Sequence, residues 1–252
     1  MRKSATFVVA TMILFAALPA PSATAVPASP ELNAAAETCF GKTPGTWAEM
    51  IAACTKIVSV NVAPDAKAVA FYNRGSAYSH SGDNAKALAD FNDALKLVPK
   101  LARALEARAS IYIGQQKYDL AIADLNKAIL LEPTSTVAFN NRAMAYLGKK
   151  DAKNAIADLT KAIALDPKDA TSYTARAGAY IMLGDKPRAL ADLDKAIEMN
   201  PNQPIALFNR GVLLENKGDK DKARADFEAV LKLTPDNKPA KDELAALDKP
   251  GK

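Results

Sequence analysis

Few side chains in this 252-residue sequence could carry out catalysis. His80 is the only histidine, so a histidine base would have to act on a neighbour such as Ser79 or Ser81. Adjacent residues on a helix do not face each other, so this spacing does not place a base against a nucleophile. A phosphate loop, a dinucleotide fingerprint and an H-E-x-x-H set are all missing from the sequence. We therefore predict that the protein is not an enzyme and needs no cofactor.

The first 25 residues have the layout of a secretory signal peptide. Arg2 and Lys3 form a positive start, residues 5–17 are an uncharged apolar run, and residues 23–25 read Ala-Thr-Ala. The run is shorter than the roughly 20 residues that span a bilayer, so an uncleaved anchor is the less favoured alternative. We predict cleavage after Ala25, no stable membrane span afterwards, and a periplasmic or secreted location.

Cys39 and Cys54 are the only cysteines. In an oxidising compartment an even count favours a disulfide bond, and closing a loop near the 15-residue case is worth about 3 kcal/mol. Two separate thiols, one of them in the core, are the alternative. One histidine and two cysteines do not favour a metal site, and we predict none.

Prolines recur every 34 residues and define a repeat. With this proline at position 32, the sequence divides into five units: 68–101, 102–135, 136–169, 170–203 and 204–237. Small residues then recur at positions 8, 20 and 27, and large apolar residues at positions 11 and 24. Small columns let two helices approach closely, large columns fill the space between them, and the proline ends the second helix. Each unit is therefore predicted to be a pair of helices joined by a turn.

The most regular charged columns are position 7, always arginine, and position 23, always aspartate: Arg74, Arg108, Arg142, Arg176 and Arg210 with Asp90, Asp124, Asp158, Asp192 and Asp226. The arginines could form a row that binds an anionic ligand. The alternative is a structural ladder, in which each arginine pairs with an aspartate of its own or a neighbouring unit. We favour the ladder, because arginine and carboxylate pair bidentately and the two columns occur together in every unit.

The pattern over residues 68–237 resembles the tetratricopeptide-repeat family. The resemblance implies an all-α fold, a right-handed α-solenoid of helix-turn-helix repeats whose first helices line a concave face. It also implies binding of a protein or peptide partner. Basic and acidic residues are interspersed, although the formal charge is +5, so we predict no nucleic-acid partner.

In the family, positions 2, 5, 9, 12 and 13 face the concave surface, which implies a candidate partner-binding groove. Its residues are Tyr72, Ser76, Arg103, Glu106, Ser110, Asn140, Met144, Thr171, Thr174, Phe208 and Glu215. Members that grip an acidic tail carry lysine at position 5, and no unit here does. A nearly neutral lining suits an amphipathic helix or an extended apolar peptide. The alternative is that many of these side chains pack against the next unit.

The ends of a repeat array need capping, because each end unit exposes its stacking face. We expect a flexible segment over residues 26–44 and a degenerate half-repeat over 45–61, whose partner helix is missing or irregular. A capping helix is expected over 238–250. The resulting functional hypothesis is an envelope scaffold or adaptor. A self-assembling solenoid and a non-catalytic accessory subunit are the alternatives.

Overall fold

The computed structural model describes residues 29–248, and the predicted signal peptide lies outside them. Within this range the chain forms α-helices and no strand, which confirms the predicted all-α fold. The helices are α1 (Pro30–Cys39), α2 (Trp47–Ser59), α3 (Pro64–His80), α4 (Asn84–Leu97), α5 (Ala102–Gly114), α6 (Tyr118–Leu131), α7 (Thr136–Gly148), α8 (Ala152–Leu165), α9 (Ala170–Met182), α10 (Lys186–Met199), α11 (Pro204–Lys217), α12 (Lys220–Leu233) and α13 (Lys238–Leu247).

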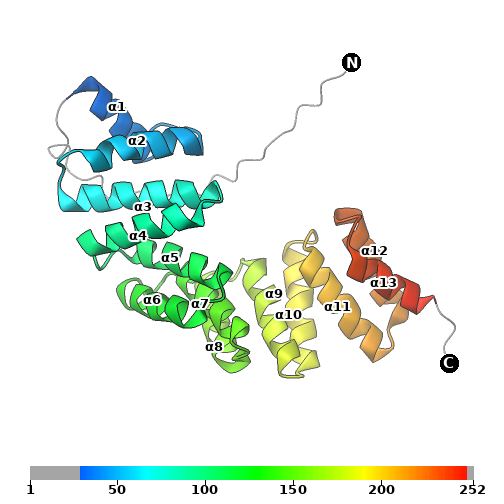
Figure 1. The fold of residues 1–252 in the computed structure, drawn as a ribbon. Coiled ribbons are helices and arrows are strands. Elements are labelled where there is room, and N and C mark those ends of the chain that lie inside the picture. Colours follow the sequence, from blue (N-terminus) through cyan, green and yellow to red (C-terminus); the bar gives the residue numbers. More distant parts are fainter. Residues whose placement is uncertain (1–28, 249–252) are drawn as a thin grey trace, which may run out of the picture.

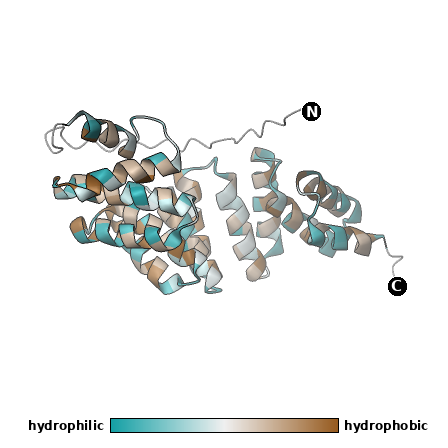
Figure 2. Ribbon diagram, turned by 45° about the horizontal axis from the view of Figure 1, so that its top comes forward, coloured by the Kyte–Doolittle hydropathy of each residue, from teal (hydrophilic) through white to brown (hydrophobic). Residues whose placement is uncertain are grey.

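The helices stack in sequence order into a curved array (Figure 1). Each odd-numbered helix from α3 to α11 packs with the next helix of its own unit, and those from α3 to α9 also contact the next odd-numbered helix. The even-numbered helices of successive units make no comparable contact within residues 29–248. The first helices of the units therefore line the inner, concave side, as α5 and α7 do in Figure 1, while α6 and α8 lie outside. Every helix carries both hydrophobic and hydrophilic residues (Figure 2), as partly buried helices do.

Turn residues between the paired helices take the left-handed backbone conformation. Gly82, Gly184 and Gly218 do so with φ between 76° and 95°. Gln116 and Lys150 stand at the equivalent places in units two and three and keep the same turn, with φ of 58° and 61°. A side chain with a Cβ is strained in this conformation, whereas glycine is not.

The N-terminal segment differs from the expectation. Residues 30–39 form helix α1 and not a flexible tether, so α1 and α2 make a complete helix pair. Ser29 caps α1, accepting a hydrogen bond from the Leu32 amide at 3.1 Å. Leu32, Ala35 and Ala36 pack against residues of α2 in one apolar cluster. This helix was not predicted, because its apolar side is mostly alanine and its amphipathic pattern is therefore weak.

A buried disulfide bond joins Cys39 of α1 to Cys54 of α2, with a Cα–Cα distance of 4.8 Å. Residues 30–59 contain neither arginine nor aspartate, so the N-terminal pair lacks the Arg–Asp columns of the five units. The disulfide holds two helices together at the one pair without those charges. Asn73 of α3 donates to the Cys39 carbonyl oxygen at 2.8 Å and links this pair to the first unit.

Packing inside each unit follows a size rule at positions 8 and 24. Units two to four combine alanine with leucine there, while the end units combine Gly75 with Phe91 and Gly211 with Phe227. A Cβ added at Gly75 would lie 2.8 Å from the Phe91 ring, and one at Gly211 would lie 2.7 Å from the Phe227 ring. The glycine in each end unit thus makes room for a larger side chain on the facing helix.

The C-terminal end is covered by α13. Ala240, Leu244 and Leu247 of this helix pack against the apolar cluster of the fifth unit, and Asn237 caps its start. Arg224 of α12 donates to Asp248 at 2.6 Å and ties the end of α13 down.

Candidate functional site

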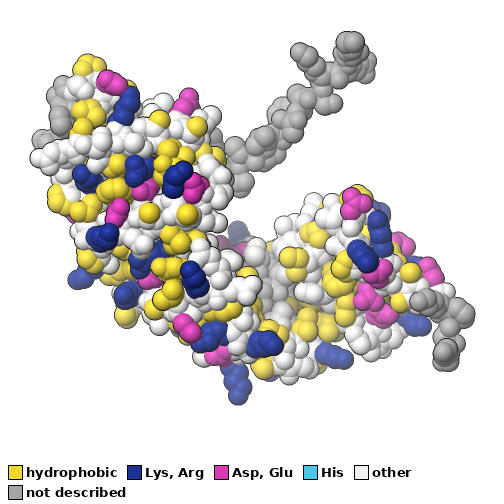
Figure 3. Space-filling view, viewed as in Figure 1, with side chains coloured by type: hydrophobic (Ala, Val, Ile, Leu, Met, Phe, Trp, Pro, Cys, Tyr) yellow, Lys and Arg dark blue, Asp and Glu magenta, His cyan; other side chains and the backbone are white. Residues whose placement is uncertain are grey.

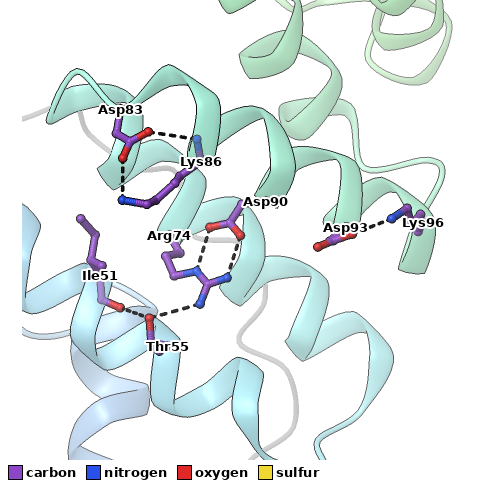
Figure 4. Close-up of polar contacts among 8 residues, drawn as sticks. All are labelled: Ile51, Thr55, Arg74, Asp83, Lys86, Asp90, Asp93 and Lys96. Carbon is purple, nitrogen blue, oxygen red and sulfur yellow. Dashed lines mark hydrogen bonds and ion pairs between the residues drawn. The ribbon is translucent and has the colours of Figure 1, made fainter.

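The constant spacing of arginine and aspartate produces a repeated ion pair between the two helices of each unit. Arg74 donates from Nε and Nη2 to the two carboxylate oxygens of Asp90, at 2.8 and 2.7 Å (Figure 4). Its third nitrogen, Nη1, donates to Thr55 of the preceding helix pair at 3.2 Å. The guanidinium group is therefore held on three sides, by its own unit and by the one before.

The other four arginines repeat this geometry. Each binds its own aspartate through Nε and Nη2, and each donates from Nη1 to position 25 of the preceding unit: Asn92, Asn126, Thr160 and Asp194. The hydrogen bonds to the aspartate raise the pKa of Arg142 and of its equivalents. The aspartates are buried, so the arginines are needed to compensate their charge. In this geometry the arginine donors already have partners and do not form an open anion site.

Position 5 of the expected groove serves the fold in every unit. Tyr72 and Phe208 lie against the phenylalanine at position 24 of their own units, with ring centroids 6.0 and 5.7 Å apart. Glu106 accepts from Ser135 at 2.6 Å, and Asn140 donates to Asp169 at 3.1 Å.

Thr174 is buried and donates to Gln203 at 2.8 Å. The first helix of the next unit is preceded in each case by one of these partners as its N-cap residue: Ser135, Asp169 or Gln203. The polar residues at position 5 thus join successive units, and Thr174 is not accessible to a partner.

The remaining groove residues are more open. Ser110 and Thr171 are exposed, Arg103 and Glu215 are half-buried, and Ser76 is half-buried. Ser76 donates to the Tyr72 carbonyl oxygen of its own helix at 3.0 Å.

Exposed apolar side chains stand on the same inner helices. Val137, Met144 and Ile205, at positions 2 and 9, are 54%, 49% and 69% exposed. Exposed apolar groups on a concave face gain free energy when a partner covers them. These three side chains make the inner face of units three and five partly apolar.

Two carboxamides lie beside this lining, at position 6. Asn141 and Asn209 are half-buried and make no hydrogen bond within residues 29–248. No buried side-chain nitrogen or oxygen in that range lacks a partner, so both amides remain open to solvent. A free carboxamide can both donate and accept, which matches the alternating groups of a peptide main chain.

Glu106 has an altered acidity. Burial raises its pKa above the ordinary value, against the opposing effect of the hydrogen bond from Ser135.

His80 does not face a nucleophile. Its ring stacks on Trp47 of α2, with centroids 4.3 Å apart and planes 7° apart. The neighbouring Ser79 directs its hydroxyl to Asn84 at 3.4 Å. Within residues 29–248 there is no cluster of three or more metal-ligating side chains. In the same range, no helix combines the length and the apolar character needed to cross a bilayer.

These observations define a class of protein: an all-helical repeat solenoid with a concave inner face. The family follows from the sequence match. The model of the tetratricopeptide repeat (TPR) matches residues 72–136, 107–170, 140–204 and 174–238, so the chain belongs to this family. No curated protein sequence matches the chain.

Solved structures of similar fold are TPR proteins. YrrB, described as a TPR protein with an unusual peptide-binding site, is 22% identical with a TM-score of 0.60, covering 75% of this chain and 96% of its own. PilF of Pseudomonas aeruginosa is 19% identical with a TM-score of 0.65, covering 73% and 90%. MamA is 25% identical with a TM-score of 0.57, covering 68% and 96%. These similarities support the solenoid fold.

Proposed function

We propose that this protein is a scaffold of the cell envelope, whose concave groove binds an uncharged segment of a partner protein. The fold supports a protein-interaction role in general terms. The observation that carries the finer proposal is the exposed apolar lining formed by Val137, Met144 and Ile205 on the inner helices. An amphipathic helix or an extended apolar peptide would cover these side chains and could bond to Asn141 and Asn209.

The envelope location rests on two features. The first 25 residues have the layout of a secretory signal peptide. The disulfide between Cys39 and Cys54 is of the kind that persists in oxidising compartments. Fractionation of cells expressing the full chain tests this part: recovery of the chain in the cytosol, with an uncleaved N-terminus, would contradict it.

Groove binding is tested by crosslinking and pull-down from the envelope fraction with two matched variants. Val137→Glu places a charge on the inner face of unit three, and Leu165→Glu places one at the end of the outer helix of the same unit. We expect a stoichiometric partner to be lost with Val137→Glu and retained with Leu165→Glu. Loss with both variants, or with neither, would rule out the groove as the binding site.

The self-assembling alternative has less support, because α13 covers the C-terminal stacking face and presents exposed Lys241 and Asp242 to solvent. Light scattering after size exclusion separates the two: a monomer at every concentration is expected, and end-to-end growth would favour assembly.

A further inference from the structure

Helix α6 breaks the repeat on the outer side of the array. Positions 19 and 29 of the other units hold Lys86, Asn154, Arg188 and Lys222, and Lys96, Ala164, Glu198 and Lys232. Unit two alone has a leucine at both, Leu120 and Leu130. Both positions vary among the units, and unit two is the one that places a large apolar side chain at each of them, which distinguishes the outer surface of α6.

The two leucines lie on one exposed face. Leu120, Ala123, Lys127 and Leu130 follow each other at spacings of three, four and three residues, which places them along one side of α6. Leu130 is 82% exposed and Leu120 is 51% exposed, while Ala123 and Lys127 are also exposed. Helix α6 itself lies on the outer side of the curve (Figure 1).

Basic side chains border this face. A crevice of about 390 Å³ next to α6 is lined by Lys96, Lys127 and Arg108, together with Leu95 and Leu105. Lys127 has no ion pair within residues 29–248, and the pair of Lys96 with Asp93 is exposed and weak. Arg108 is held by Asp124, so the two lysines carry the accessible charge.

The part of the chain around α6 also carries a net positive charge. Residues 84–170 hold thirteen lysines and arginines against ten acidic residues, whereas residues 171–248 hold twelve against thirteen. In Figure 3, lysine and arginine side chains spread over the face of α4 to α8, while acidic side chains gather around α12 and α13. The leucine face thus lies in the more basic of these two segments.

We propose that this outer face of α6 docks on an anionic phospholipid surface. Leu120 and Leu130 enter the interface between headgroups and acyl chains, and Lys96 and Lys127 bind lipid phosphates beside them. Protruding leucines bordered by exposed lysines are the combination that holds a peripheral protein on such a surface. An outward-curving face reaches a flat bilayer without obstruction, and it leaves the concave groove free for a protein partner.

The test is co-sedimentation of the chain without residues 1–25, which contains every described residue. The vesicles are phosphatidylcholine alone or phosphatidylcholine with phosphatidylglycerol. We expect binding to the anionic vesicles only, weakened at least tenfold in 0.5 M NaCl because salt screens the lysines. The variant Leu120→Ser/Leu130→Ser should lower the partition coefficient at least tenfold without changing thermal stability, since both side chains are exposed.

The matched control is Lys222→Ser/Lys232→Ser, which changes the same two positions in unit five and removes two charges. The partition coefficient of this control should stay within twofold of that of the unchanged chain. The proposal is overturned if anionic vesicles do not bind, if the leucine variant binds normally, or if the control loses as much binding. A leucine-dependent dimer in light scattering, with no vesicle binding, would assign the face to a protein contact instead.

Discussion

Replacing Gly75 by alanine tests the size rule that governs packing between the two helices of a unit. The added Cβ would lie 2.8 and 3.0 Å from two carbons of the Phe91 ring and 3.1 Å from the Asp90 Cβ. The ring is buried and cannot swing into solvent. The helices must therefore separate or the ring must leave its preferred rotamer.

Two opposing effects set the magnitude. Overpacking a buried site costs about 1–3 kcal/mol, whereas alanine is favoured over glycine inside a helix by roughly 0.8–1.0 kcal/mol. The difference between these two effects means that Gly75→Ala should lower the free energy of unfolding by up to about 2 kcal/mol. Gly178 is the matched control, because it lies inside α9 with no heavy atom within 4 Å of an added Cβ. Gly178→Ala should raise stability by up to about 1 kcal/mol.

A double-mutant cycle isolates the contact. Phe91→Leu alone should cost about 1–2 kcal/mol by leaving a cavity. Together with Gly75→Ala it recreates the alanine–leucine combination of units two to four, so the double variant should be close to the unchanged chain. Urea unfolding followed by circular dichroism measures all four proteins, and a coupling of about 2 kcal/mol is expected. If Gly75→Ala is as stabilising as Gly178→Ala, or if the two changes are additive, the size rule is wrong.

Three further changes test the framework. Arg142→Ala should lower the free energy of unfolding by about 3 kcal/mol, because it leaves the buried Asp158 carboxylate unpaired. The double variant Arg142→Ala/Asp158→Ala should lower it by less. Unchanged thermal stability with lost ligand binding would show that the arginine serves a ligand instead. Lys150→Gly should add about 1 kcal/mol of stability by relieving its left-handed backbone, and a loss in urea unfolding would contradict this. Glu106→Gln should raise the melting temperature at pH 7. The raised pKa of Glu106 means that the folded state binds its proton more tightly than the unfolded state, so stability falls as pH rises from about 4.5 through that pKa. The higher melting temperature of the glutamine variant should therefore disappear in acid. A gain in melting temperature that does not depend on pH would exclude this cause.

The candidate groove shows where sequence reasoning was insufficient. Family positions placed Tyr72, Glu106, Thr174 and Phe208 in the lining, but the structure uses them within or between units. At position 5, the aromatic side chains contact the facing helix of their own unit, whereas the polar side chains bond to the start of the next unit. Exposed positions such as Val137 and Ile205 have no such neighbour and remain available.

The repeat and its helix pairs were predictable from the sequence, because the 34-residue period is marked by regular columns of small and large residues and by a proline that ends each second helix. It also identified the paired Arg and Asp columns and the two cysteines, since each stands in a regular pattern or a countable set. The tertiary structure decided what those residues contact: Arg74 bridges two units, and α1 completes a helix pair that its alanine-rich face did not reveal. Period and composition are local properties of the chain, whereas a contact depends on distances that only the stacked helices fix.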